Sequence, residues 1–189
     1  CYRLNAIKIK TTISTNCNMN IDHIEAHPWK IIEETFDPKR VEAAESIFSL
    51  GNGAMGQRAN FEEQYSGNSF QGSYVAGVFY PDKTKVGWWK NGYPEYFAKV
   101  LNAPNWIGID LKCNNETVDI NNATVHHFRR ELDMQNGLYT RSVTLSTTNG
   151  IKLTLTSERF LAMFQEELGC IRYAVQLHDQ KATISLTPY

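Results

Sequence analysis

A glycine-rich stretch, SLGNGAMGQRANFEE, has the spacing of a turn that binds phosphate. Gly51, Gly53 and Gly56 spell G-x-G-x-x-G, a pattern whose backbone approaches a pyrophosphate in dinucleotide-binding folds. That chemistry also needs a buried strand before the motif, a helix that opens on its last glycine, and an acidic residue about 20 positions further on. The glycines therefore predict phosphate binding only where all three parts are present.

The surroundings of this motif provide none of the three parts. The preceding segment, PKRVEAAESIFSL, is helical in its first half instead of forming a Val/Ile-rich strand. The following segment contains Gly67 and Gly72 and has no helical repeat of apolar residues. In the region about 20 positions on, the first carboxylate is Asp82. The sequence therefore favours a turn in which glycine allows positive φ or a close backbone approach.

A second candidate site is dense in aromatic and amide side chains, in GWWKNGYPEYFAKVLNAPNWIGI. Aromatic rings stack on the apolar face of a sugar and amides bind its hydroxyls, so one interpretation is a carbohydrate surface. The other is that the rings fill a core or a domain interface, which the run FAKVL favours because it is typical of buried structure. The residues of this candidate carbohydrate or domain-interface surface are Trp88, Trp89, Tyr93, Tyr96 and Trp106.

Other residues with catalytic chemistry form no recognisable set. His126 and His127 are adjacent, so in a strand they face opposite ways and do not readily share one metal. Glycoside hydrolysis uses two carboxyl groups that flank one bond, and no such pair is singled out by the spacing of Glu62-Glu63, Glu95, Glu131 and Asp133. We therefore assign no catalytic residue, no metal site and no cofactor from the residues alone.

The composition is that of an ordinary globular chain. It has 189 residues, enough for one domain, with 42% hydrophobic residues, 21% charged residues and a net charge of −1. Because the basic residues are dispersed, we expect neither nucleic acid nor a membrane as a partner. The four cysteines have no C-x-x-C spacing and there is no apolar signal segment, so we expect a cytoplasmic protein.

The expected secondary structure is mainly antiparallel strands. Two alternating runs flank the turn Thr148-Asn149-Gly150, and Asn-Gly in that position is a strong hairpin signal. Ile151, Leu153 and Leu155 fall on one face of the second run. Strands at roughly 10-residue spacing indicate an all-β sandwich with a few short helical turns.

The two ends of the chain suggest a piece of a longer protein. Residues 1–27 lack an apolar period and are expected to be a disordered or extended lead-in. The chain begins with Cys1, and it stops just after a strand-like run. We therefore expect a β-sandwich domain at 28–189 that is incomplete at its C-terminal end.

Five blocks of sequence, in order along the chain, resemble the N-terminal domain of glycoside hydrolase family 65. This family includes maltose, trehalose and kojibiose phosphorylases and some trehalose hydrolases. The resemblance runs from about Trp29 to the end of the chain. The blocks are Glu45–Glu63, Gly72–Tyr80, Trp88–Ile109, Arg129–Arg141 and Ser157–Met163.

The resemblance implies a large antiparallel β-sandwich of the galactose mutarotase-like kind, followed by an (α/α)6 barrel that holds the active site. In such enzymes one glutamate protonates the glycosidic oxygen while inorganic phosphate attacks the anomeric carbon with inversion. These residues belong to the barrel, which this chain lacks, so no catalytic residue is carried over to any position. The isolated chain is expected to be inactive.

The implied activity of the full-length enzyme is phosphorolysis of an α-glucoside, with maltose as the first choice, to give β-glucose 1-phosphate and glucose. The alternatives are a trehalose or other α-glucoside hydrolase of the same family, or a freestanding carbohydrate-binding module. The implied partners are the barrel of the same chain, the disaccharide and phosphate, with a homodimer as a further arrangement.

Two residues depart from the family pattern in the glycine turn. Ala54 stands where a large residue, often Tyr, is usual, and Ala59 stands where Gly is usual. Because alanine resists positive φ, we expect Ala59 to have a negative φ or a strained one. If the usual aromatic lines the interface with the barrel, Ala54 alters that contact.

Overall fold

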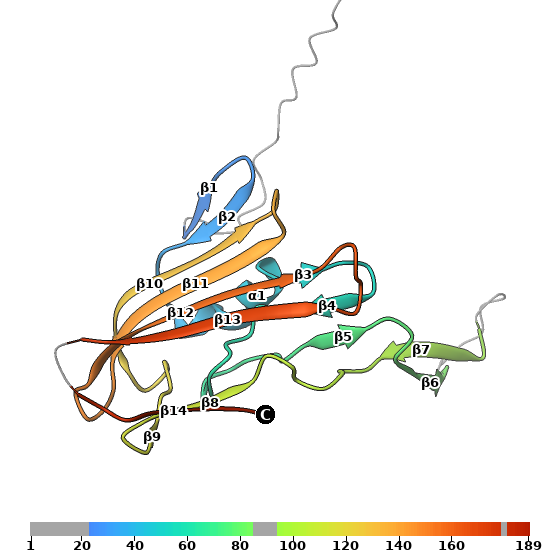
Figure 1. Ribbon diagram of the computed structural model, residues 1–189. Coiled ribbons are helices and arrows are strands. Elements are labelled where there is room, and N and C mark those ends of the chain that lie inside the picture. Colours follow the sequence, from blue (N-terminus) through green and yellow to red (C-terminus); the bar gives the residue numbers. More distant parts are fainter. Residues whose placement is uncertain (1–22, 85–93, 179–180) are drawn as a thin grey trace, which may run out of the picture.

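The computed structural model describes residues 23–84, 94–178 and 181–189 (Figure 1). In these ranges nearly all regular structure is antiparallel β, with one 3-10 turn, η1 (Pro38–Arg40), and one short helix, α1 (Val41–Ile47). The strands are β1 (Ile24–Ala26), β2 (Lys30–Glu33), β3 (Leu50–Gly51), β4 (Met55–Gln57), β5 (Ser73–Val75), β6 (Phe79–Lys83), β7 (Tyr96–Val100), β8 (Ile109–Cys113), β9 (Glu116–Thr117), β10 (Thr124–Asp133), β11 (Leu138–Ser146), β12 (Lys152–Leu161), β13 (Gly169–Leu177) and β14 (Ile184–Pro188).

The largest sheet has six strands in the order β1-β2-β10-β11-β12-β13. Its centre is the predicted hairpin of β11 and β12, in which Leu145 pairs with Leu153 and Gly150 takes a φ of 77° in the turn. Burial alternates along both strands, so one face of the sheet is inside and the other lies nearer to solvent. The prediction that Leu153 and Leu155 share an inner face is confirmed.

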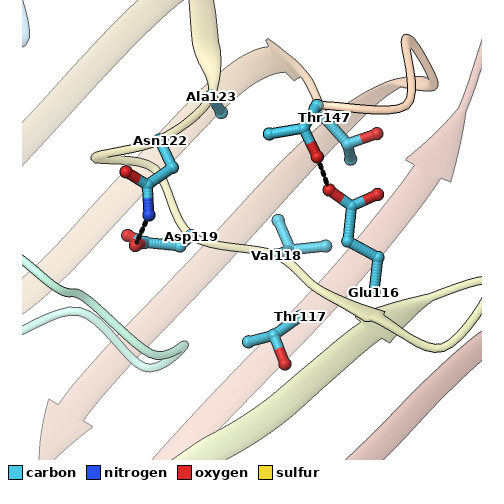
Figure 2. A pocket seen from close by; sticks show the side chains of 8 residues that line it. Glu116, Thr117, Val118, Asp119, Asn122, Ala123 and Thr147 are labelled. Carbon is cyan, nitrogen blue, oxygen red and sulfur yellow. Dashed lines mark hydrogen bonds between the residues drawn. The ribbon is translucent and has the colours of Figure 1, made fainter.

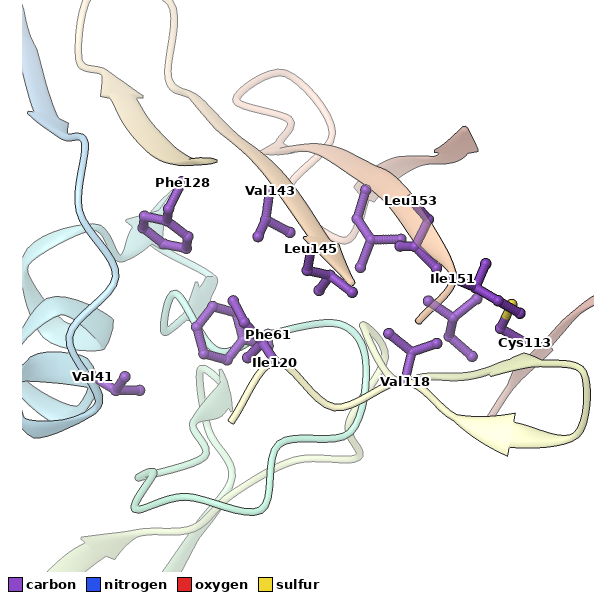
Figure 3. Packing of buried hydrophobic residues seen from close by; sticks show 12 residues of the cluster. Val41, Phe61, Cys113, Val118, Ile120, Phe128, Val143, Leu145, Ile151 and Leu153 are labelled. Carbon is purple, nitrogen blue, oxygen red and sulfur yellow. The ribbon is translucent and has the colours of Figure 1, made fainter. Parts of the chain in front are cut away.

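A second layer covers the inner face of this sheet. Cys113 of the sheet β14-β8-β9 and Val118 after it belong to one apolar cluster with Leu145 and Leu153 (Figure 3). Leu111 of β8 is buried in the same cluster. The side chains of both layers exclude water from one continuous apolar cluster, and burial of this kind is the main driving force for folding. The expected antiparallel β-sandwich is thus confirmed.

The short helix α1 and the residue after it pack against the inner face of the large sheet. It extends to Ile47, beyond the helical patch expected from the sequence around Lys39 to Ala44. Ala44 and Phe48 are buried in a second apolar cluster with Tyr139 of β11. The helix therefore packs against the sheet through its buried residues, since a helix this short is not stable alone.

The glycine motif forms a hairpin between β3 and β4. Gly53 has a φ of 95°, which glycine adopts readily. The Asn52 side chain anchors the turn: its Oδ1 accepts hydrogen bonds from the backbone N–H groups of Ala54 and Met55, and its Nδ2 donates to the carbonyl of Ala162. The interpretation of this motif as a turn between strands is therefore confirmed.

The two alanines that depart from the family pattern have ordinary surroundings. Ala59 is not among the described residues with positive φ, is almost fully buried, and donates its N–H to the Glu45 carbonyl. The expectation of a negative φ at Ala59 is confirmed. Ala54 accepts a hydrogen bond from the Ala76 N–H, so the turn lies against the chain that follows β5.

The described residues contain no helix with both the length and the hydropathy of a membrane span. Of the lead-in expected at 1–27, residues 1–22 lie outside the described residues. Ile24–Ala26 form β1, which pairs with β2 at the edge of the large sheet.

We predict that Gly53→Ala lowers the free energy of unfolding by about 1–2 kcal/mol, because a Cβ is strained at positive φ. Gly51→Ala is the matched control, since its φ is not positive and its Cβ meets only the Met55 carbonyl at 3.7 Å. Urea denaturation of both variants measures the difference. Equal effects in the two variants contradict this account of the turn.

Candidate functional site

The aromatic residues of the predicted carbohydrate or domain-interface surface fall into three settings. Trp88, Trp89 and Tyr93 lie outside the described residues. Tyr96 is on β7 and its side chain is exposed. Trp106 is half-buried in the loop before β8, with its ring close to Gly169 at the start of β13. Among the described residues the two remaining rings therefore have different environments, and the proposed platform stays a prediction.

The expectation that FAKVL is buried is wrong. These residues lie on β7 and just after it, and all of them are exposed. The reason is the surrounding topology: β7 pairs only with β6, and this two-stranded sheet has no covering layer in the described part of the chain. Apolar composition alone does not distinguish a core strand from a strand on an uncovered hairpin.

The hairpin of β6 and β7 borders a groove that is free of charge. Phe79 pairs with Val100 and Pro81 pairs with Ala98, so these four side chains share one face. The groove has a volume of about 360 Å³ and also touches the glycine turn and β5. It is lined by Gly53, Ala54, Met55, Gly56, Tyr74, Val75, Ala76, Gly77, Val78, Phe79, Ala98 and Val100.

A smaller cavity of about 120 Å³ lies beside Glu116 and Asp119 (Figure 2). Both carboxylates accept hydrogen bonds from neighbouring side chains. Glu116 accepts hydrogen bonds from the side chains of Thr148 and Asn149. Asp119 accepts one from the side-chain amide of Asn122 at 2.7 Å. The cavity is well below the roughly 300 Å³ of a usual ligand pocket, so we do not assign it as a catalytic pair.

The two adjacent histidines lie at an irregularity of β10, where His127 pairs with Thr144 of β11. A bulge in β10 interrupts the pairing between Val125 and His127. His126 hydrogen-bonds the Ser146 hydroxyl at 2.8 Å through Nε2. The described residues contain no group of three His, Cys, Asp or Glu side chains placed to hold a metal ion.

The most unusual feature of the interior is a layer of ion pairs, which we call the buried ion layer. It consists of Arg130, Arg141 and Arg159 with Glu33, Glu62 and Glu63, each no more than 3% exposed. The three arginines come from the adjacent strands β10, β11 and β12, on the inner face of the large sheet. The glutamates come from β2 and from the segment after β4.

Arg141 forms the centre of this layer. Its Nη1 and Nη2 each donate to Glu63 at 2.5 Å, and Nη2 also donates to Glu62 at 2.7 Å. Arg159 lies 3.3 Å from the other oxygen of Glu62 and donates to the Asn60 carbonyl. The segment 60–63 is thereby held against the middle of the sheet.

Aromatic faces complete the surroundings of the guanidinium groups. Arg141 lies 4.9 Å from the Phe61 ring centroid and Arg159 lies 4.5 Å from that of Tyr139. A desolvated cation on an aromatic face gains about 2 kcal/mol or less. These contacts offset part of the cost of burying charge.

The charges of the layer determine the protonation of its members. Burial acts to raise the pKa of Glu62, but the nearby Arg159 and Arg141 outweigh it and hold the pKa below its usual value. Burial acts to lower the pKa of Arg141, and Glu63 and Glu62 outweigh that effect and raise it. A general acid for glycoside cleavage needs a raised pKa, so Glu62 is not suited to that role.

A family description, the N-terminal domain of glycosyl hydrolase family 65, matches residues 31–189. The chain belongs to this family. The resemblance inferred from the five sequence blocks is therefore confirmed.

Several relatives of this family 65 chain are named as phosphorylases. The maltose phosphorylase of Bacillus subtilis is 46% identical over 165 residues, which is 87% of this chain and 22% of that protein. The kojibiose phosphorylase of Halothermothrix orenii is 32% identical over 76% of this chain and 17% of that protein. The chain thus spans about a fifth of the length of these relatives.

The fold of a solved relative agrees with this assignment. A protein from the human microbiome, by name a kojibiose phosphorylase, superposes with a TM-score of 0.73 at 31% identity. The match covers 82% of this chain and 20% of that chain.

Sequence reasoning missed the buried ion layer. The sequence presents Arg130 only as one of many dispersed basic residues, and Glu62-Glu63 only as a candidate catalytic pair. One signal was present: Arg130, Arg141 and Arg159 each occupy the inward phase of an alternating strand. The carboxylates that neutralise them are distant along the chain and cannot be identified from the sequence.

We predict that Arg141→Met lowers the free energy of unfolding by about 3–5 kcal/mol, because Glu62 and Glu63 lose a buried partner. Arg172→Met is the control, since Arg172 pairs with Glu158 at the exposed surface and contributes about 1 kcal/mol or less. Chemical denaturation followed by circular dichroism measures both. A loss of similar size in the two variants speaks against a special role for Arg141.

Acid is expected to destabilise the layer. Because the pKa of Glu62 in the folded chain lies below its usual 4.5, its contribution is complete above that pH and is lost as the pH falls through the folded pKa. Thermal unfolding midpoints between about pH 7 and about pH 3 measure the slope. Glu62→Gln should flatten the acid slope and Glu158→Gln should not. An unchanged slope in Glu62→Gln refutes the assignment.

Proposed function

We propose that this chain is the non-catalytic N-terminal domain of an inverting disaccharide phosphorylase that cleaves maltose with inorganic phosphate. The products are β-glucose 1-phosphate and glucose. The observation that carries the proposal is the 46% identity to a maltose phosphorylase. A kojibiose phosphorylase and a trehalose phosphorylase are each 32% identical.

The chemistry requires one general acid and one phosphate site. An acid protonates the glycosidic oxygen while phosphate attacks the anomeric carbon from the opposite face, so the configuration inverts. Phosphate is already an anion and needs no carboxylate to activate it, in contrast to the water of a hydrolase. The proposal places both sites in the part of the full-length protein outside this chain.

The carboxylates of the chain itself support a non-catalytic role. Among the described residues, the buried glutamates are Glu33, Glu45, Glu62 and Glu63. Each one has an arginine within ion-pair distance. At Glu62 burial acts to raise the pKa, but Arg159 and Arg141 outweigh it and hold the pKa below its usual value, so this carboxylate is a poor proton donor near neutral pH. The domain is therefore expected to shape and support the catalytic part.

The groove beside β6 and β7 is the proposed contact with that part. Its lining carries no charged side chain, and Phe79 and Val100 are more than half exposed. Contiguous apolar surface of this kind marks an interaction site. Because the chain is about a fifth as long as its relatives, the remaining polypeptide is the proposed occupant. A cytoplasmic location and a dimer of the full-length enzyme remain part of the same proposal.

We predict that the full-length protein releases β-glucose 1-phosphate from maltose only when phosphate is supplied, as followed by NMR of the sugar anomers. Trehalose and kojibiose should be turned over far more slowly. The 189-residue chain alone should release no product.

Three outcomes would change the assignment. Glucose release without phosphate places the protein among the hydrolases of the family. Faster turnover of trehalose or kojibiose changes the substrate and leaves phosphorolysis in place. Release of the α-anomer of glucose 1-phosphate contradicts inversion.

A further inference from the structure

The large sheet ends on a long strand that has a neighbour on one side only. β13 has nine residues and pairs with β12 along its whole length. On its other side, no strand of the described chain pairs with it. The opposite edge of the same sheet is β1, which has only three residues. An edge strand presents a row of unpaired N–H and C=O groups, so β13 offers far more free backbone than β1 does.

The ladder with β12 shows which residues of β13 direct their backbone groups to the free edge. The His178 N–H donates to the Lys152 carbonyl at 3.0 Å, and the Ala162 N–H donates to the Leu168 carbonyl at 2.9 Å. Both bonds continue the register of β12 and β13, in which every second residue is hydrogen-bonded to its partner. The residues between them turn their N–H and C=O groups outward, and these are Ile171, Tyr173, Val175 and Leu177.

Nothing in the described residues of β13 protects this edge from pairing. Native proteins protect free edges with very short strands, with Pro or Lys, or with a bulge. The strand sequence GCIRYAVQL contains neither Pro nor Lys, and its pairing with β12 is regular throughout. Its one charged residue, Arg172, pairs with Glu158 at the exposed surface. A long edge of this kind is expected to be covered in the native protein.

The apolar core is also incomplete at this edge. Leu153 of β12 has no exposed surface, whereas Val175 and Leu177 of β13 pack against the same cluster and are only half-buried. The second layer shows the same change at its own last strand. Leu186 of β14 pairs with the fully buried Leu111 and so shares its face, yet Leu186 is 47% exposed. Both layers of the sandwich therefore lose cover at an edge strand.

Two occupants fit such an edge, a second copy of the chain and the polypeptide that follows Tyr189. The chain spans 22% of the length of the maltose phosphorylase that it resembles. Tyr189 directly follows β14, where the second layer loses its cover. A segment tethered there has an effective concentration on the order of millimolar, which a second copy in solution does not reach. The observations therefore favour the continuing polypeptide.

We propose that β13 accepts a strand from the polypeptide beyond Tyr189, which extends the large sheet and covers the core beside Val175 and Leu186. This inference rests on one part of the proposed function, namely that the chain is the N-terminal part of a longer protein. The added strand pairs with the outward N–H and C=O groups of β13. Its side chains alternate, and those on the inner face are apolar because they lie beside the apolar cluster.

Amide hydrogen exchange, read at single residues in the full-length protein and in the 189-residue chain, tests this pairing. The N–H groups of Ile171, Tyr173 and Val175 should exchange at least about tenfold more slowly in the full-length protein, because a second ladder then holds them. Arg172 and Ala174 are the internal control. Their N–H groups bond to β12 in both proteins, so their exchange rates should differ less.

A proline at an outward position gives a second, independent test. Proline is tolerated at a free sheet edge but not inside a sheet. In the full-length protein, Val175→Pro should therefore raise the exchange rates of Ile171 and Tyr173 at least about tenfold, toward those of the 189-residue chain. Val175→Ala is the matched control, since it also shortens the side chain but keeps the N–H group. Ala174→Pro should disrupt the 189-residue chain itself, because that N–H group bonds to β12.

Equal exchange of Ile171, Tyr173 and Val175 in the two proteins overturns the proposal, whether or not the proline variant folds. Equal protection in full-length Val175→Pro and Val175→Ala overturns it as well. Protection that rises with the concentration of the 189-residue chain, with twice its mass in light scattering, assigns the edge to a second copy and also overturns it. Failure of the full-length protein to phosphorolyse maltose has no effect on this test, because exchange is measured without substrate.

Discussion

The ion pairs of Arg141 with Glu62 and Glu63 are the interaction on which the rest of this structure depends. Three buried charges meet on the inner face of the large sheet, at distances of 2.5–2.7 Å. Removing charge from water costs several kcal/mol per ion, and only close pairing with further hydrogen bonds offsets that cost. The pairing therefore permits one position of the segment 60–63 and penalises others, because a shifted segment leaves charge unpaired in the interior.

This one constraint positions the features on either side of it. Upstream, the segment leads back to β4 and the glycine turn, where Asn52 ties the chain to Ala162 after β12. Downstream, it leads into the loop that carries Tyr65, whose ring meets Phe61 edge-on.

Much of the architecture was predictable because it depends on local patterns. The alternation along β11, β12 and β13, and Asn-Gly between the first two of them, indicated an antiparallel sandwich. The glycine motif was interpreted as a turn because its flanks lacked the parts of a phosphate site. The exposure of FAKVL was not predictable: the same apolar run suits a core strand, and only the absence of a covering layer in the described structure decides between them.

By itself, the sequence determined the family, the strands and the turns, since these depend on residues near one another along the chain and on blocks shared with relatives. The tertiary structure alone decided which distant charges meet and which polar atoms stay unpaired. Arg141 and Glu63 are far apart along the chain, and β13 is an edge strand only because no other described strand pairs with its outer side. Which charges are neutralised and which polar atoms are paired depend on three-dimensional distances. Coulomb interactions and hydrogen bonds act over distances that exist only once the chain has folded.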